Sequence, residues 1–312
     1  MKHVSLTRAL FVSAFISTAV VSCGSNAAED TSSTVVESTA VDTSVGDIDG
    51  SGSTERIVSL SPTHTEILFA IGAGVQVVAV DAMSNHPAEA SAVVTSLSGY
   101  EPNVESIVSY EPDLVVIGDD YNGLAEQLAS VGIDSWAAPA PLNLDEVLVQ
   151  IEDLGERVGK LDEATELASS MRASIDEIVA STVKLEAPLA YYHELDDTYF
   201  TATSNTFVGS VYGLFGLRNI ADAAEDQSDY PQLSAEFIIS QNPDLIFLAD
   251  TKCCAVSAES VSARPGWQTL TAVQNGRVIA LDDDIASRWG PRVVDFVRFI
   301  SEAISQLAQA AG

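Results

Sequence analysis

The chain has 312 residues, of which 45 are Asp or Glu and only 14 are Lys or Arg, so its formal net charge at pH 7 is −31. Such acidity argues against nucleic acid and anionic lipid headgroups as partners, because both would be repelled. We interpret the charge as a solubility adaptation rather than a cation site. The spacing of the three cysteines does not indicate a disulfide framework.

The first residues predict export. A basic start and an apolar run over residues 9–21 are followed by Ser22 and Cys23. The run is too short, at about 13 residues, to cross a bilayer of about 30 Å. We therefore expect a signal peptide over residues 1–22 and an extracytoplasmic protein lipid-anchored to the membrane through Cys23, with ordinary signal cleavage nearby as the alternative. Residues 23–54 are polar and lack periodicity, which predicts a flexible tether.

Residues 55–142 alternate between short strand and helix patterns. This alternation predicts an α/β lobe with a mainly parallel sheet. The expected strands cover 56–60, 76–80, 113–117 and 135–138, and the expected helices begin at Pro62, after Asn103 and at Leu124.

A thirteen-residue pattern that begins at Glu105 returns 131 residues later at Glu236, with six identities and no gap. Each copy has a helix-capping residue two positions before the Glu, then about two helical turns, a Pro-Asp break and an apolar run. The sequence therefore predicts the same unit twice, a helix followed by a buried strand. The spacing exceeds the roughly 20 to 50 residues of a solenoid repeat, so it predicts two similar lobes with a ligand cleft between them.

Between the copies, residues 143–185 lack proline, and apolar residues recur from 144 to 184 at helical spacing. We expect one connecting backbone helix, about 50 Å long, that spans both lobes. Residues 186–312 repeat the α/β alternation and form the second lobe. Its expected strands cover 189–193, 199–202 and 278–281, besides the strand of the repeat, and its expected helices include 207–215 and 291–309.

Five motifs occur in one family's order: Ser59-Leu-Ser-Pro-Thr-His-Thr-Glu-Ile-Leu, Asn103-Val-Glu, Tyr230-Pro-Gln-Leu-Ser, Arg264-Pro-Gly-Trp and Arg288-Trp-Gly-Pro-Arg292. The chain resembles the substrate-binding proteins of ABC importers for vitamin B12 and ferric siderophores, most of all the B12-binding members. The resemblance covers nearly everything from residue 56 onward. It implies two α/β lobes joined by a long rigid backbone helix, little closure on binding, and a monomer that docks on a permease dimer with its ATPase subunits.

The resemblance also implies roles for individual residues. Glu105 and Glu236 match the glutamates that pair with permease arginines, although a first-turn Glu can instead only complement the helix dipole. The implied ligand is a cobalamin-like corrinoid, which the protein carries as cargo and not as a cofactor. Its expected contacts are His64, His86, Tyr100, Glu194, Tyr199, Tyr230, Asp284, Arg288 and Trp289. His86 departs from the pattern, which has an aromatic residue at that position.

Other classes fit less well. We find no nucleophile elbow, no H-E-x-x-H motif, no P-loop and no metal-ligand spacing of histidines, so the sequence does not indicate an enzyme or a metal site. Haem or a ferric siderophore is the alternative ligand, and for haem His86, Tyr100 or Tyr230 would be the axial ligand. His64 could instead cap its helix, and His193 is expected to be a buried structural residue. No role is assigned to Cys253 and Cys254.

Overall fold

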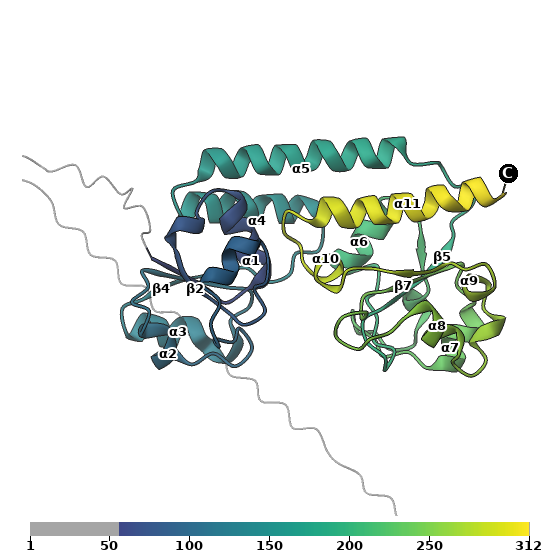
Figure 1. Cartoon of the computed structure of the whole chain (residues 1–312), viewed down its shortest axis with the longest axis horizontal. Coiled ribbons are helices and arrows are strands. Elements are labelled where there is room, and N and C mark those ends of the chain that lie inside the picture. The colour runs from purple at the N-terminus through teal and green to yellow at the C-terminus, as the bar shows by residue number, and fades with distance from the viewer. Residues whose placement is uncertain (1–55, 312) are drawn as a thin grey trace, which may run out of the picture. The chain divides into compact units, whose positions relative to one another are not determined.

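The computed structural model describes residues 56–311 (Figure 1). The expected signal peptide, tether and lipidation of Cys23 lie outside the described residues. Within residues 56–311, no helix combines the length and the apolar character needed to cross a membrane.

The N-terminal lobe is built on a parallel four-stranded sheet in the order β2-β1-β3-β4. Side chains of β1 and β3 alternate between its faces: Ile57 and Leu114 pack toward the connecting helices, whereas Val58 and Val115 pack against α2 and α3. Its elements are β1 (Ile57–Ser59), α1 (Pro62–Ala70), η1 (Gly74–Gln76), β2 (Val77–Val80), η2 (Ala88–Ala92), α2 (Val104–Val108), β3 (Leu114–Ile117), η3 (Tyr121–Gly123), α3 (Leu124–Ser130) and β4 (Asp134–Ala137).

The C-terminal lobe repeats this topology in a second parallel sheet, in the order β6-β5-β7-β8. Its elements are β5 (Ala190–Glu194), α6 (Phe207–Gly213), β6 (Arg218–Asn219), η4 (Ala221–Ala223), α7 (Ala235–Gln241), β7 (Leu245–Leu248), α8 (Ala258–Ser262), η5 (Trp267–Thr269), α9 (Thr271–Gln274), β8 (Val278–Ala280), α10 (Asp283–Ser287) and α11 (Val293–Ala311). The expected fold class, two similar α/β lobes with parallel sheets, is confirmed.

The repeated pattern forms α2–β3 in one lobe and α7–β7 in the other. The backbone N–H of Ser106 donates to Asn103 Oδ1 at 2.8 Å, and that of Phe237 donates to Ser234 Oγ at 3.1 Å. Both helices therefore begin at the predicted caps. The strands that follow are fully buried and take the same place in the two sheets.

The connecting segment is two helices rather than the single expected one. Residue 158 ends α4 (Leu144–Arg157), and α5 (Leu161–Ser181) begins three residues later. Gly159 has φ +72°, a left-handed conformation that glycine adopts at helix ends, and this stops the helix. The chain then reverses, so that α5 packs along α4 and continues toward α11 (Figure 1). At 1.5 Å per residue, α5 is about 30 Å long. It packs against α11 of the C-terminal lobe, and α4 contacts α6 of that lobe.

One apolar core runs through both lobes. It contains Ile57 and Leu114 of the first sheet, Val147 of α4, Ile175 of α5 and Phe247 of the second sheet. Each lobe has a smaller outer core on the opposite face of its sheet. Because the principal core is shared, the lobes cannot separate without exposing buried apolar surface.

The strand expected over 199–202 does not form. Tyr199 has φ +71°, which interrupts an extended strand, and Phe200 makes only an isolated bridge to Gln232. The fourth strand of this sheet is instead β6, two residues long, which carries no recognisable strand pattern.

Candidate ligand-binding cleft between the lobes

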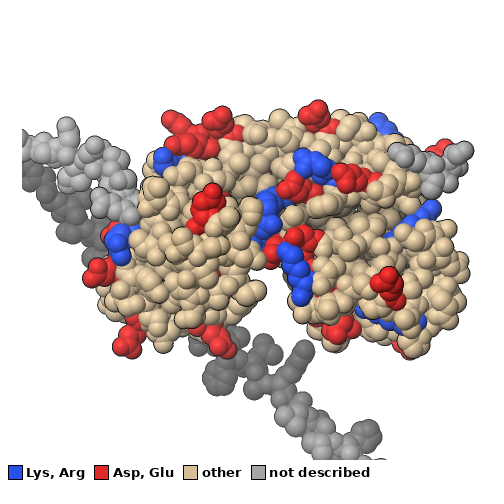
Figure 2. Space-filling view, in the orientation of Figure 1, with Lys and Arg blue, Asp and Glu red and all other residues tan. Residues whose placement is uncertain are grey.

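The carboxyl ends of the two sheets point toward the same junction. Arg288 follows β8 and contacts the loop after β2: its Nη2 donates to the carbonyl oxygen of Met83 at 3.1 Å and its Nη1 to Asn85 Oδ1 at 2.9 Å. Ligands of parallel α/β sheets bind at this edge of the strands. Figure 2 shows the surface hollowed between the lobes, with basic and acidic side chains side by side at the base of the hollow.

A buried ionic cluster joins the lobes at this junction. Glu66 of α1, with 2% of its side chain exposed, accepts a hydrogen bond from Arg288 Nη1 at 2.9 Å. It also accepts from Arg292 Nε at 2.9 Å and Nη2 at 2.5 Å. These bonds and the charge of Glu66 raise the pKa of Arg292, so this guanidinium stays protonated. Arg288 and Arg292 therefore already hold a carboxylate of the protein.

Asp284 extends the cluster toward the C-terminal lobe. Its carboxylate accepts from Arg288 Nη2 at 2.7 Å, from Lys252 Nζ at 2.9 Å and from Asn85 Nδ2 at 3.1 Å. Partial burial works to raise the pKa of Asp284, but the bond from Lys252 and the charge of Arg288 outweigh it and hold the pKa low. Both terminal nitrogens of Arg288 have protein partners, so a ligand would compete with contacts that join the lobes.

Exposed aromatic side chains lie on the loops that follow the strands. Tyr100 and Tyr121 follow β2 and β3, and their ring centroids are 5.9 Å apart. Phe200 and Tyr230 follow β5 and β6 in the other lobe. Between 38% and 72% of each of these four residues is exposed. Tyr100 and Tyr230 were predicted from the sequence. Tyr121 and Phe200 were missed. For Tyr121, its place just after the predicted strand at 113–117 was a usable signal.

The predicted docking residues occupy equivalent exposed positions. Glu105 and Glu236 lie in the first turns of α2 and α7. Both helices lie on the side of the sheets away from α5 and α11, and the hollow between the lobes opens on that side (Figures 1 and 2). The two carboxylates therefore occupy matching places on the two lobes.

A family described as periplasmic binding protein matches residues 57–285. The chain belongs to this family. It is 31% identical over 258 residues to an uncharacterized ABC transporter substrate-binding lipoprotein of Bacillus subtilis, covering 80% of each chain. It is 32% identical over 250 residues to a cobalamin-binding protein of Halobacterium salinarum, covering 77% of this chain and 67% of the relative. A haem-binding periplasmic protein of Roseiflexus has the same fold, with a TM-score of 0.74 and 25% identity over 82% of this chain and 99% of that one.

The family predicted from the five motifs is thus confirmed, and with it a binding component of transport rather than an enzyme. Within residues 56–311, no three or more His, Cys, Asp or Glu side chains are grouped so that they could hold a metal ion.

In this periplasmic binding protein, Glu194 and Tyr199 belong to a cluster in the C-terminal lobe that also contains Arg264 and Trp267. Glu194 is fully buried, and its two oxygens accept from Arg264 Nη1 and Nη2, each at 2.6 Å. The Arg264 guanidinium lies 4.6 Å from the ring centroid of Trp267, on which Tyr199 stacks at 5.7 Å. Asp250 interacts with Glu194. Burial is the largest cause that raises the pKa of Asp250 to about 7, and the charge of Glu194 is the next one.

His64 and Trp289 lie in the interior of the junction. His64 is fully buried, and its Nδ1 is 2.8 Å from Ser61 Oγ. Burial lowers its pKa to about 4, opposed in part by Gln150, so the ring is neutral near pH 7. Trp289 donates from Nε1 to Gln150 Oε1 at 3.1 Å. The expected structural role of His193 is confirmed: it is buried, it bonds the Tyr212 hydroxyl at 2.8 Å, and burial lowers its pKa to about 3.

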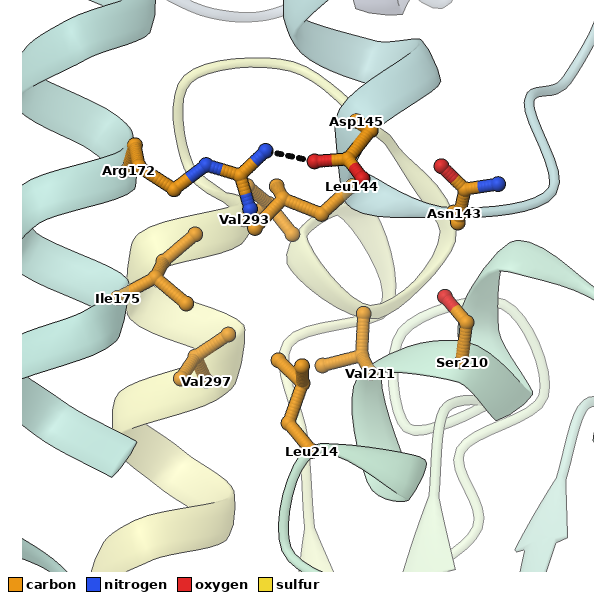
Figure 3. A pocket seen from close by; sticks show the side chains of 10 residues that line it. All are labelled: Asn143, Leu144, Asp145, Arg172, Ile175, Ser210, Val211, Leu214, Val293 and Val297. Carbon is orange, nitrogen blue, oxygen red and sulfur yellow. Dashed lines mark hydrogen bonds and ion pairs between the residues drawn. The ribbon is translucent and has the colours of Figure 1, made fainter. Parts of the chain in front are cut away.

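His86 is exposed and lines a depression of about 390 Å³ together with Glu66, Phe69 and Arg292. The structure therefore brings His86 next to the ionic cluster. A separate cavity of about 160 Å³ lies where α4, α5, α6 and α11 meet (Figure 3). Aliphatic side chains such as Ile175 and Val297 form its floor, and the Asp145–Arg172 ion pair lies on its rim.

Proposed function

We propose that this protein captures a cobalamin-like corrinoid between its lobes and delivers it to an ABC permease. The observation that carries the proposal is the set of four exposed rings, Tyr100, Tyr121, Phe200 and Tyr230, on the loops at the carboxyl ends of the two sheets. Aromatic rings suit a large flat ligand because each can bury about 150–250 Å² at small entropic cost. The relative from Halobacterium, which is named as cobalamin-binding, supports the same ligand.

In this proposal the tyrosines contact the ring of the ligand, and Asp284 and Arg288 approach its side chains from the base of the cleft. His86 contacts the ligand from the neighbouring depression. The remaining predicted residues, His64, Glu194, Tyr199 and Trp289, act from behind the walls by holding the loops in place, since His64 and Glu194 are fully buried.

Haem is the second candidate, because exposed tyrosines are also suitable axial ligands and a haem-binding relative shares the fold. An anionic siderophore is disfavoured, since Arg288 and Arg292 both bond Glu66.

Titration of purified protein with cyanocobalamin, haemin and a ferric catecholate separates these ligands. Cyanocobalamin should bind at micromolar concentration or below. Tyr230→Ala should weaken it by about 1–3 kcal/mol through loss of a buried aromatic contact. Tyr230→Phe is the matched control, because it keeps the ring and removes only the hydroxyl. If haemin binds with a shifted Soret band that Tyr→Phe at position 100 or 230 abolishes, and cyanocobalamin does not bind, the corrinoid assignment is wrong.

The same proposal gives Glu105 and Glu236 the role of binding arginines of a two-fold permease with its ATPase subunits, one from each lobe of a monomeric binding protein. Converting both to Lys should abolish uptake in cells while ligand affinity is unchanged, because charge reversal adds repulsion to a lost contact. Glu166→Lys with Glu177→Lys, on the exposed surface of α5, makes the same charge change elsewhere and should leave uptake intact. Normal uptake by the Glu105/Glu236 variant would leave these residues with the dipole role alone.

We also infer that the protein is held outside the cytoplasm by lipid on Cys23, as the name of its Bacillus relative supports. Mass spectrometry of the N-terminal peptide from the native host should find a diacylglyceryl-modified Cys23. An unmodified terminus beyond that residue would contradict the anchor.

A further inference from the structure

Cys253 and Cys254 are joined to each other by a disulfide, which closes a ring within the loop that follows β7. The side chain of Cys254 packs on the outer core of the C-terminal lobe, whereas Cys253 is exposed. The backbone N–H of Cys254 and that of Val256 both donate to the carbonyl oxygen of Asp250, at 3.2 and 3.5 Å. An exposed disulfide can be attacked by a thiol from solution, so this one is open to exchange.

The same loop is fastened to α10 through one carboxylate. Asp283 accepts from the backbone N–H of Thr251 at 2.9 Å, of Lys252 at 2.8 Å and of Cys253 at 3.0 Å. The Thr251 hydroxyl adds a fourth bond to it at 2.8 Å. Three consecutive residues next to the disulfide are thereby held by the first residue of α10.

From α10 the contacts continue to the other lobe. Lys252 Nζ bonds Asp282 at 2.7 Å and Asp284 at 2.9 Å. Asp284 in turn bonds Arg288 and, across the junction, Asn85. The disulfide loop and the ionic cluster at the base of the cleft are therefore parts of one connected set of hydrogen bonds.

We propose that Cys253–Cys254 is a thiol–disulfide exchange site that sets the order of this loop and, through α10, the affinity of the cleft. A thiolate of a small dithiol attacks Sγ of Cys253, the S–S bond breaks, and Sγ of Cys254 leaves as a thiolate that takes a proton. The second thiol of the reagent then displaces Sγ of Cys253 and closes the oxidised cyclic reagent. Two electrons pass from the dithiol, and the protein gains two thiols.

Opening the ring removes the covalent restraint on the peptide between the two cysteines. The bonds from residues 251–253 to Asp283 then have to hold a freer backbone, so the loop and the start of α10 open more often. The effect on ligand affinity rests on the function proposed above, whereas the effect on the loop does not.

The test uses the full chain with Cys23→Ser, whose only cysteines are then 253 and 254. Dithiothreitol should release two thiols per chain without unfolding the protein. After reduction, amide hydrogen exchange of residues 251–253 and 283–285 should be faster on the order of tenfold, and that of α5 unchanged. Cys253→Ser with Cys254→Ser should exchange like the reduced chain and should not respond to the reagent.

The ligand arm uses cyanocobalamin with the same oxidised chain and the Ser/Ser variant, so that no reductant meets the corrinoid. The variant should bind about fivefold more weakly or worse, the lower end of typical coupling between sites. Two results overturn the proposal: no thiols released from the folded chain, or thiols released with unchanged exchange in both segments. Absence of cyanocobalamin binding by the oxidised chain refutes the ligand assignment instead, and the thiol and exchange results then still decide the fate of the disulfide site.

Discussion

Replacing Glu66 by Gln tests whether the ionic cluster holds the lobes together. The substitution keeps the size of the side chain and one carbonyl acceptor, but it removes the charge that faces Arg288 and Arg292. Arg288 keeps Asp284 and the carbonyl oxygen of Met83 as partners. The side chain of Arg292 has no other hydrogen-bond partner among the described residues, and it would keep only the unbonded charges of Asp282 and Asp284 nearby.

The expected cost follows from that geometry. Removing one member of a buried ion pair typically costs about 3–5 kcal/mol, because the other charge stays buried without a partner. Here Arg288 is partly compensated and Arg292 is partly solvated, so we expect about 2–4 kcal/mol for Glu66→Gln. For a chain of this length, that corresponds to a fall in Tm of roughly 5–10 °C.

Urea and thermal unfolding at pH 7 measure the effect. Glu126→Gln is the control, since Glu126 is exposed on α3 and its side chain makes no hydrogen bond among the described residues. The control should lie within about 0.5 kcal/mol of the parent protein. If Glu66→Gln is as stable as this control, the cluster contributes nothing to stability and the reasoning is refuted.

Three further changes have defined outcomes. Burial is the main cause that raises the pKa of Asp250 to about 7. The folded protein therefore holds this proton more tightly than the unfolded chain, and the resulting stability is fully present below about pH 4 and is lost as the pH rises through about 7. Asp250→Asn should remove this loss. In urea titrations, the fall in unfolding free energy from pH 5 to pH 8 should be smaller in the variant than in the parent protein by about 2 kcal/mol or more. An unchanged pH profile would contradict the assignment. A Cβ at Gly155 would lie 2.3 Å from Ala164 Cβ, so Gly155→Ala should cost about 1–3 kcal/mol in thermal unfolding by forcing α4 and α5 apart. Gly213→Ala, where a Cβ meets no heavy atom within 4 Å, is its control and should be neutral or stabilising. Val297→Ile adds one methylene to the cavity of about 160 Å³ and should raise stability by up to about 1 kcal/mol; a lower Tm would show that the cavity cannot take the group.

Local signals predicted the repeated half of each lobe well. Asn103 and Ser234 are capping residues, Pro-Asp ends each helix, and the apolar run that follows fits only a buried strand. The single long helix was wrong because the apolar spacing continues across residues 158–160 and does not show the left-handed backbone of Gly159 that ends α4. The strand at 199–202 was wrong because its β-branched and aromatic composition conceals the left-handed backbone of Tyr199.

For the proposed site, the expected contacts came from the family resemblance rather than from local sequence patterns. The resemblance named Tyr100, Tyr230, Asp284 and Arg288 as contacts. Tyr100 also follows the predicted strand at 76–80, whereas β6, which precedes Tyr230, was not predicted. The partner that joins the lobes, Glu66, lies 222 residues from Arg288 and has no local signature, because only the meeting of the two sheets brings them together. The spacing of Cys253 and Cys254 likewise does not predict whether the two are joined by a disulfide, which the structure shows.

The principal apolar core that passes from one sheet to the other also bears on how binding is driven. A receptor whose halves swing apart when empty must spend part of each ligand's binding energy on selecting the closed form, and its apparent affinity falls by the population of that form. Here Val147 and Ile175 bind the halves into one body, so the empty receptor is already arranged to receive its cargo. The rate at which the ligand dissociates then depends on its contacts with the side chains that line the cleft, and release requires the transporter to weaken those contacts.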